Sequence, residues 1–178
     1  SADAVIPYTA VLRNRILTGQ GAAVFGATGA DYNWDFEVST VIDLTPPKVT
    51  SVIPRAGSTE PRNTVVEITF NEAIDPTTVS GSRAQFGVWN GAAKLSGTTG
   101  VSNGYRTVEF VTDKACGTNS CGGTIYCLPA SATLTAKATA ARLSLEPPAA
   151  VDPPDGVADL AGNSLDGNGN NHAEGPEI

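Results

Sequence analysis

Residues 31–40 read Asp-Tyr-Asn-Trp-Asp-Phe-Glu-Val-Ser-Thr, and this strict alternation of apolar and polar side chains predicts a β-strand with one apolar face. The apolar face carries Tyr32, Trp34, Phe36 and Val38. A lone strand of this kind is not stable in water and has to place its aromatic face in the core of a sheet. The question that the rest of the sequence has to answer is which sheet receives it.

The composition is typical of an all-β protein with many turns. The chain has 178 residues, of which 19 are Gly, 12 are Pro and only 16% are charged. Its net charge of -7 repels both nucleic acid and anionic membrane surfaces. No apolar run approaches the roughly 18 residues that a membrane-spanning helix needs. We therefore expect no nucleic-acid partner and no membrane insertion.

The sequence divides into an N-terminal arm, a linker and one larger domain. Residues 1–40 contain the aromatic strand and a second alternating stretch at 5–13, too little for a domain of its own. Residues 41–47 end in Pro46-Pro47, which stiffens the chain and is typical of a linker. We expect residues 48–178 to form the domain.

Short strand patterns separated by turn signals follow one another through this domain. The expected strands are residues 49–54, 64–70, 84–90, 94–99, 105–112 and 134–138, with a further stretch near 125–128. Asp75-Pro76 predicts one helical turn, because Asp is a good cap and Pro suits the first helical position. The pattern predicts an immunoglobulin-like antiparallel sandwich, with a β-barrel as the alternative.

Three motifs in this domain resemble the bacterial immunoglobulin-like domains of the S-layer and surface-adhesin type. They are Thr-Pro-Pro-Lys-Val-Thr-Ser-Val-Ile-Pro-Arg-Ala-Gly at 45–57, Val-Glu-Ile-Thr-Phe-Asn-Glu-Ala-Ile-Asp-Pro at 66–76 and Val-Ala-Asp-Leu-Ala-Gly-Asn at 157–163. The resemblance covers about residues 46–170. It implies an extracellular or cell-surface sandwich of the kind that is joined in tandem, with no catalytic residues.

The resemblance also implies that the aromatic last strand of the family lies before the domain in this chain and not after it. In that family the late loop leads into a final strand of the type Tyr-x-Trp-x-Phe. Here no such strand follows residues 157–163, whereas one lies before the domain at Tyr32–Phe36. The arm therefore resembles the tail of one domain, and residues 48–178 resemble the next domain without its own last strand.

Three arrangements follow from this displacement. The chain is a filament or surface-array subunit that binds copies of itself head-to-tail by donor-strand complementation, or a fragment of a larger multi-domain secreted protein. In both, Trp34 and Phe36 enter the core of a neighbouring sandwich. In the third, a monomer folds its arm back onto its own domain, which the stiff linker at 41–47 makes harder.

Residues 166–177 predict a calcium site, because they follow the spacing of the twelve-residue calcium loop. The candidate ligands are Asp166, Asn168, Asn170, the carbonyl oxygen of His172, and Glu177. Oxygen ligands of this kind suit Ca²⁺. Asn171 stands where the loop usually has Gly, and Asn is the next best residue for a left-handed turn. The alternative is a solvated Gly/Asn turn without metal.

The three cysteines, Cys116, Cys121 and Cys127, lie close together in a Thr-rich chain with few Lys, which favours an oxidising, extracellular setting. We expect one disulfide that closes the loop at 114–129, with a pairing that the spacing leaves open.

The sequence gives little support for an enzymatic function, since it has one His and no recognisable nucleophile motif or phosphate-binding motif. The alternative functions are those of an adhesin or carbohydrate-binding module. In these, Trp89 would stack on a glycan.

Overall fold

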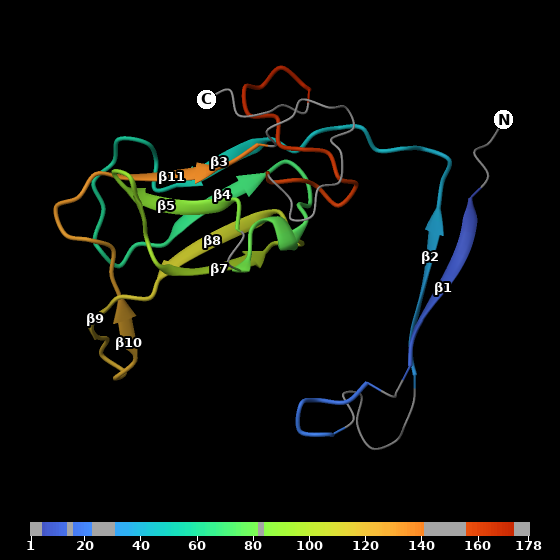
Figure 1. Ribbon diagram of the computed structural model, residues 1–178, viewed down its shortest axis with the longest axis horizontal. Coiled ribbons are helices and arrows are strands. Elements are labelled where there is room, and N and C mark those ends of the chain that lie inside the picture. The colour runs from blue at the N-terminus through green and yellow to red at the C-terminus, as the bar shows by residue number, and fades with distance from the viewer. Residues whose placement is uncertain (1–4, 14–15, 23–30, 82–83, 141–155, 173–178) are drawn as a thin grey trace. The chain divides into compact units, whose positions relative to one another are not determined.

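The computed structural model divides the chain into two compact units, residues 1–43 and 44–178 (Figure 1). The division falls inside the segment 41–47 that we expected to be a linker. The described residues are 5–13, 16–22, 31–81, 84–140 and 156–172.

The first unit contains a two-stranded antiparallel sheet. Strand β1 (Ile6–Leu12) pairs with β2 (Tyr32–Val38), the aromatic strand. Tyr8 lies opposite Phe36 and Ala10 lies opposite Trp34. Since directly opposed residues share a face, the apolar side chains of both strands gather on one side of the hairpin.

The second unit is an all-β sandwich, as predicted, and its larger sheet has four antiparallel strands. Their order is β3 (Val49–Ile53), β4 (Val66–Phe70), β8 (Thr107–Thr112) and β7 (Gly97–Ser102). The inward-facing residues are those expected from the alternation, and they are buried: Val66, Ile68, Phe70, Val108 and Phe110.

The smaller sheet has three strands in the order β11 (Leu134–Ala138), β5 (Phe86–Asn90) and β6 (Ala93–Lys94). Phe86 and Val88 of β5 enter the same core cluster as the inward side chains of the larger sheet. The two sheets therefore pack face to face around one core, as the sheets of a sandwich do and those of a closed barrel do not.

One predicted strand, residues 94–99, turns out to be two strands in different sheets. β6 ends at Lys94, the chain crosses the sandwich edge in two residues, and β7 begins at Gly97. A Cβ at Gly97 would lie 2.4 Å from the carbonyl oxygen of Val111 and 2.6 Å from the ring of Phe110. The switch between sheets depends on a glycine that lets the backbones approach closely, and hydrophobic alternation carries no signal of it.

The helical turn predicted at Asp75-Pro76 is present as η1 (Pro76–Thr78), and the Asp75 carboxylate accepts a hydrogen bond from the Thr77 N–H. A two-stranded ribbon extends from the sandwich (Figure 1). Its second strand, β10 (Thr124–Tyr126), overlaps the stretch expected near 125–128, whereas its first strand, β9 (Ala115–Thr118), was not predicted. Among the described residues, no helix is long and apolar enough to cross a membrane.

Candidate functional site

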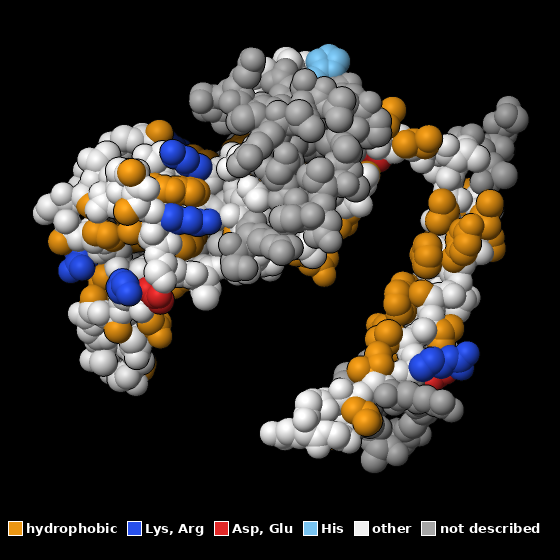
Figure 2. Space-filling view, viewed as in Figure 1, with side chains coloured by type: hydrophobic (Ala, Val, Ile, Leu, Met, Phe, Trp, Pro, Cys, Tyr) orange, Lys and Arg blue, Asp and Glu red, His pale blue; other side chains and the backbone are white. Residues whose placement is uncertain are grey.

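The apolar face of the β1–β2 hairpin is exposed along its whole length, as Figure 2 shows. Trp34 keeps 46% of its surface accessible and Phe36 keeps 45%. The ring of Phe36 stacks on that of Tyr8 at 5.6 Å, and Tyr32 contacts Trp34 at 5.9 Å. The rings are therefore ordered against one another while their outer surfaces stay accessible to a partner.

The other face of the hairpin is polar and fixes how its strands are aligned. The hydroxyl of Thr9 donates a 2.7 Å hydrogen bond to Asp35, directly across the strand pair. Arg13 forms an ion pair with Asp31 at 3.0 Å. These bonds hold the hairpin as an amphipathic ribbon with one apolar and one mainly polar face.

The smaller sheet of the sandwich ends in an open edge. β11 pairs with β5 on one side, and no strand of the described residues pairs with its other side. Ala136 lies opposite Val88, which is 1% exposed, so Ala136 also points inward. Ala136 is nevertheless exposed, so the residues that the structure describes leave the core open at this edge.

The larger sheet is uncovered along β3. Val49 lies opposite Phe70 and Val52 lies opposite Ile68, so both valines point toward the core. Each remains 43% exposed, whereas their partners Phe70 and Ile68 are 2% and 6% exposed. Inward-facing apolar side chains of a closed sandwich would be covered by the opposite sheet.

The two uncovered strands lie on the same side of the sandwich. β6 and β7 are joined by only two residues, so these two edges lie next to each other. The opposite edges of the two sheets, β3 and β11, therefore share the other side. Among the described residues four strands face three, so a strand added beside β11 would lie on the same side of the sandwich as β3, which carries Val49 and Val52.

The late loop, residues 157–163, lies at the end of the sandwich where β3 begins; this end is called the pole below. The Asp159 carboxylate accepts hydrogen bonds from the N–H groups of Ala161 and Asn163 at 2.8 and 2.7 Å. Beyond this loop, the N–H of Asp166 donates to the carbonyl oxygen of Pro47 at 2.9 Å. The end of the late loop is thereby tied to the residue that precedes the first strand.

The Asp166 carboxylate is held by several groups at once, and its side chain has no exposed surface. It accepts hydrogen bonds from the N–H groups of Gly169, Asn170 and Asn171 at 2.6, 3.1 and 2.8 Å. The Lys48 ammonium lies 3.4 Å away. Burial raises the pKa of Asp166, whereas the backbone hydrogen bonds and Lys48 lower it, and its pKa lies below the ordinary value.

The candidate calcium ligands lie in one tight loop. The side-chain oxygen of Asn168 accepts from the N–H of Asn170, and that of Asn170 accepts from the N–H of His172. Asn171 adopts a φ of 74°, the left-handed conformation that the spacing predicts. Lys48 donates to the side-chain oxygen of Asn171, which places an ammonium group beside this loop. The fifth candidate, Glu177, lies outside the described residues.

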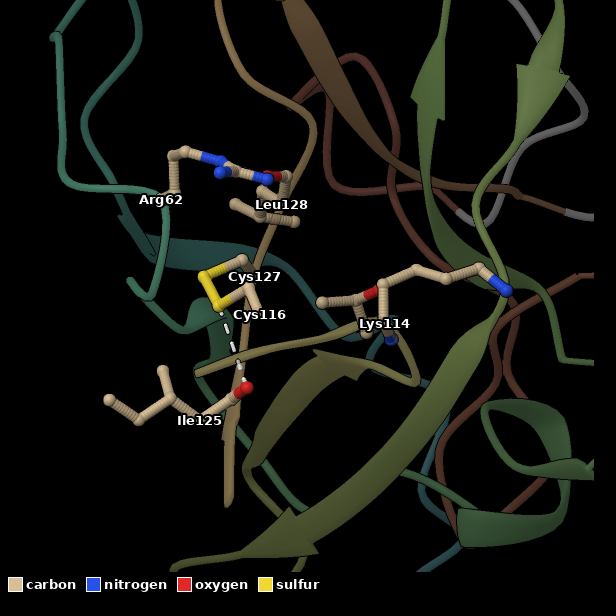
Figure 3. The surroundings of a disulfide bond; sticks show 7 residues. Arg62, Lys114, Cys116, Ile125, Cys127 and Leu128 are labelled. Atoms are coloured by element: carbon tan, nitrogen blue, oxygen red, sulfur yellow. Dashed lines mark hydrogen bonds between the residues drawn. A yellow bond between two sulfur atoms is a disulfide. The ribbon is translucent and has the colours of Figure 1, made fainter. Parts of the chain in front are cut away.

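The predicted disulfide joins Cys116 to Cys127, with their Cα atoms 5.7 Å apart (Figure 3). The bond ties β9, at the base of the ribbon, to the segment that directly follows β10. Next to it, the N–H of Leu128 donates to the carbonyl oxygen of Arg62 at 2.7 Å. The structure leaves Cys121 exposed at the tip of the ribbon, outside any disulfide.

Trp89 is less available for stacking on a glycan than its sequence position indicates. Its side chain lies on the outer face of β5 and is half-buried. The ammonium groups of Lys94 and Lys137 lie 5.2 and 5.4 Å from the centre of its ring. Because two cations already contact the ring, the structure gives the carbohydrate-binding alternative no support.

A family model described as a bacterial Ig-like domain matches residues 43–171, well over half of the chain. The match is to the broad family and does not distinguish the S-layer and surface-adhesin type within it. No curated protein and no solved structure matches the chain.

Replacing Asp166 tests whether its carboxylate holds the pole together. We expect Asp166→Asn to lower the free energy of unfolding at pH 7 by about 1–3 kcal/mol, because it removes a charged acceptor of several hydrogen bonds. A lowered folded-state pKa stabilises the fold above the unfolded-state pKa of about 3.9 and ceases to do so as the pH falls through the folded-state value. Chemical denaturation from pH 7 to pH 2 should show the difference between variant and wild type shrinking below about pH 4.

The matched control is Glu60→Gln, which changes an exposed carboxylate in the loop between β3 and β4 and should leave stability within about 0.5 kcal/mol of wild type. A difference between Asp166→Asn and wild type that is the same at every pH would contradict this role for the carboxylate.

The cysteine pairing predicts how many thiols react in the unfolded, unreduced chain. Wild type should react with one equivalent of a chromogenic thiol reagent in denaturant, Cys121→Ser with none, and Cys116→Ser with two. A reactive thiol that persists in Cys121→Ser would show a different pairing. Peptide mapping of the unreduced chain provides the independent check.

Proposed function

Because the chain belongs to the family of bacterial Ig-like domains, we propose that it is a structural subunit of an extracellular bacterial surface assembly, joined head-to-tail by donor-strand complementation. Domains of this family are typically parts of bacterial surface proteins and are generally not enzymes. The proposal assigns the β1–β2 hairpin as the donor and the uncovered side of the sandwich, between β3 and β11, as the acceptor. The partner is another copy of the chain.

The observation that carries the proposal is the match between a missing strand and a spare one. The described residues of the sandwich leave Val49 and Val52 43% exposed, although both side chains point inward. The hairpin carries an apolar face of about strand length with no cover of its own. A β2 strand added beside β11 would supply backbone hydrogen bonds to the open edge and side chains to the uncovered valines.

Binding of the donor strand buries apolar surface of both the hairpin and the acceptor sandwich, which is favourable. Complete burial of a large apolar side chain stabilises by about 1.5–3 kcal/mol, so covering the accessible halves of Trp34 and Phe36 contributes roughly 1 kcal/mol each. Val49 and Val52 of the acceptor gain cover at the same time. Backbone hydrogen bonds along β11 add to this and give the contact its orientation.

The polarity of the strands makes this contact head-to-tail. β11 runs toward the pole at which β3 begins, because Val157, close to that pole, donates to Thr139 just after β11. A donor that pairs antiparallel with β11 therefore ends at the opposite pole, from which its own linker leads away. Such a contact joins unlike surfaces of two copies, and repetition gives a filament unless the rotation between copies closes a ring.

The same contact also fits a tandem surface protein, in which a neighbouring domain of the same chain supplies the strand. The two forms differ in whether the isolated chain assembles with itself.

Calcium binding by residues 166–177 stays a prediction, and we propose it as a means of stiffening the pole. The loop geometry supports it at two of the candidate ligands, since the N–H of Asn170 donates to the side-chain oxygens of both Asp166 and Asn168, at 3.1 and 2.9 Å. The Lys48 ammonium at Asp166 opposes it, because a cation at this carboxylate has to displace or tolerate a positive charge.

The donor role predicts that the aromatic face decides assembly. We expect Trp34→Ala combined with Phe36→Ala to abolish fibres or raise the concentration needed for them at least tenfold, because about 2 kcal/mol of contact is lost. Negative-stain imaging and light scattering of the purified full chain measure this. In a Trp89→Phe background, the fluorescence of Trp34 should shift to the blue as concentration rises, since the ring leaves water.

The matched control is Val11→Ala, which removes a similarly exposed apolar side chain from the other face of the hairpin. It should assemble as wild type does. A fluorescence shift that is already complete in dilute monomer would support the arm folded back on its own domain, and would contradict assembly through exchange.

The calcium proposal predicts that millimolar Ca²⁺ raises the thermal unfolding midpoint, that a chelator reverses the rise, and that Asp166→Asn abolishes it. Lys48→Met should strengthen the effect by removing the competing ammonium group. Magnesium at the same concentration is the control, because it binds such loops poorly without octahedral geometry. An unchanged midpoint in both wild type and Lys48→Met would show that the loop is a turn without metal.

A further inference from the structure

Resting on the strand exchange proposed above, we propose that Lys137 determines the register of the exchanged strand. Its ammonium group pairs with the carboxylates of Asp35 and Glu37 on β2 of another copy. The pairing selects the alignment in which Phe36 lies opposite Ala136.

The two faces of each strand limit the possible alignments. On β11, Ala136 and Ala138 point inward, because they lie opposite the buried Val88 and Phe86, and Lys137 points outward. On β2, the even-numbered residues are apolar and the odd-numbered residues Asn33, Asp35 and Glu37 are polar. A one-residue slip would put the aromatic rings in solvent, so the allowed alignments differ by steps of two residues.

Two alignments differ from the proposed one by two residues, and strand length excludes one of them. β11 has five residues and β2 has seven. When Phe36 lies opposite Ala136, the segment 34–38 covers all of β11 and stays within β2. A shift that brings Val38 opposite Ala136 uses residues beyond the end of β2 and leaves Trp34 past the end of β11.

Size and charge decide between the two alignments that remain. With Phe36 opposite Ala136, Trp34 lies opposite Ala138, so two aromatic rings meet the two smallest inward side chains of the edge. The other alignment places Phe36 opposite Leu134, which is crowded. It also places Lys137 opposite Asn33 instead of Asp35, which loses the charge pair.

Lys137 is prepared for an acidic partner by its surroundings. Its ammonium group and that of Lys94 both lie over the ring of Trp89, at 5.4 and 5.2 Å. No carboxylate among the described residues forms an ion pair with Lys137. The two ammonium groups repel each other, because both are positively charged and lie over the same ring. A carboxylate delivered beside β11 relieves that repulsion.

The donor supplies such carboxylates in a fixed place. Asp35 is held on the outer face of the hairpin by the 2.7 Å hydrogen bond from Thr9, and Glu37 follows on the same face. In the proposed alignment Asp35 lies directly opposite Lys137 and Glu37 lies one diagonal step away, within reach of a long side chain.

Charge reversal tests the pairing. We expect Lys137→Glu to raise the concentration needed for assembly about fivefold or more at low salt, and less at high salt, because a cross-strand attraction becomes a repulsion. Lys114→Glu, at an exposed lysine near the β9–β10 ribbon, is the control and should assemble as wild type does. The chain carrying Lys137→Glu with Asp35→Lys and Glu37→Lys should recover assembly.

Cysteine cross-linking tests the alignment itself. In a Cys121→Ser background, Thr135→Cys with Glu37→Cys should form intermolecular disulfides, since these positions lie opposite each other in the proposed register. Thr135→Cys with Asp35→Cys, or with Ser39→Cys, should do so much more slowly, because each reports an alignment two residues away.

The outcomes separate the two proposals. If wild type assembles and Lys137→Glu assembles equally well, or the compensating variant gives no recovery, Lys137 does not set the register and strand exchange stands. Faster cross-linking at Asp35 or Ser39 overturns the register in the same way. If wild type forms no assembly, strand exchange fails and the role of Lys137 fails with it.

Discussion

The structure depends on a mismatch in width between two sheets that share one core. In the described part of the chain, four strands on one side face three on the other, and the inward-facing side chains Val49 and Val52 stay 43% exposed. The rest of the core is well buried, with Ile74, Val108 and Val157 fully enclosed. The described strands therefore enclose a core and leave one defined side open, which is the condition that an acceptor of an added strand has to meet.

Much of this fold could be predicted from alternation alone. The inward residues of β4, β5 and β8 follow a period of two without interruption, and the structure buries them as expected. The Asp75 cap and the left-handed Asn171 were also predictable, because each depends on the local chemistry of one residue type. The switch between sheets at Gly97 and the β9–β10 ribbon were not, since both depend on contacts distant in sequence.

The candidate site shows the same division between local and distant information. The aromatic strand at Tyr32–Val38 was evident from its own residues, whereas the surface that it fits is formed by β3 and β11, which lie far apart in the chain. Trp89 was misleading for a related reason. The strand pattern predicted an exposed Trp89 ring on the outer face of the sheet. In the structure, Lys94 and Lys137 contact this ring from the two neighbouring strands. Only strand order brings such side chains together.

The tie between the late loop and the start of β3 has a mechanical consequence. The N–H of Asp166 holds the carbonyl of Pro47, its carboxylate contacts the Lys48 ammonium, and Asn71 exchanges hydrogen bonds with the Lys48 backbone. A tensile load that enters through the linker therefore meets several bonds across the first residues of the sandwich at once, before it reaches the β3–β4 ladder. The first residues of the sandwich are therefore held by two segments that are distant in sequence, the one that follows the late loop and the one that follows β4.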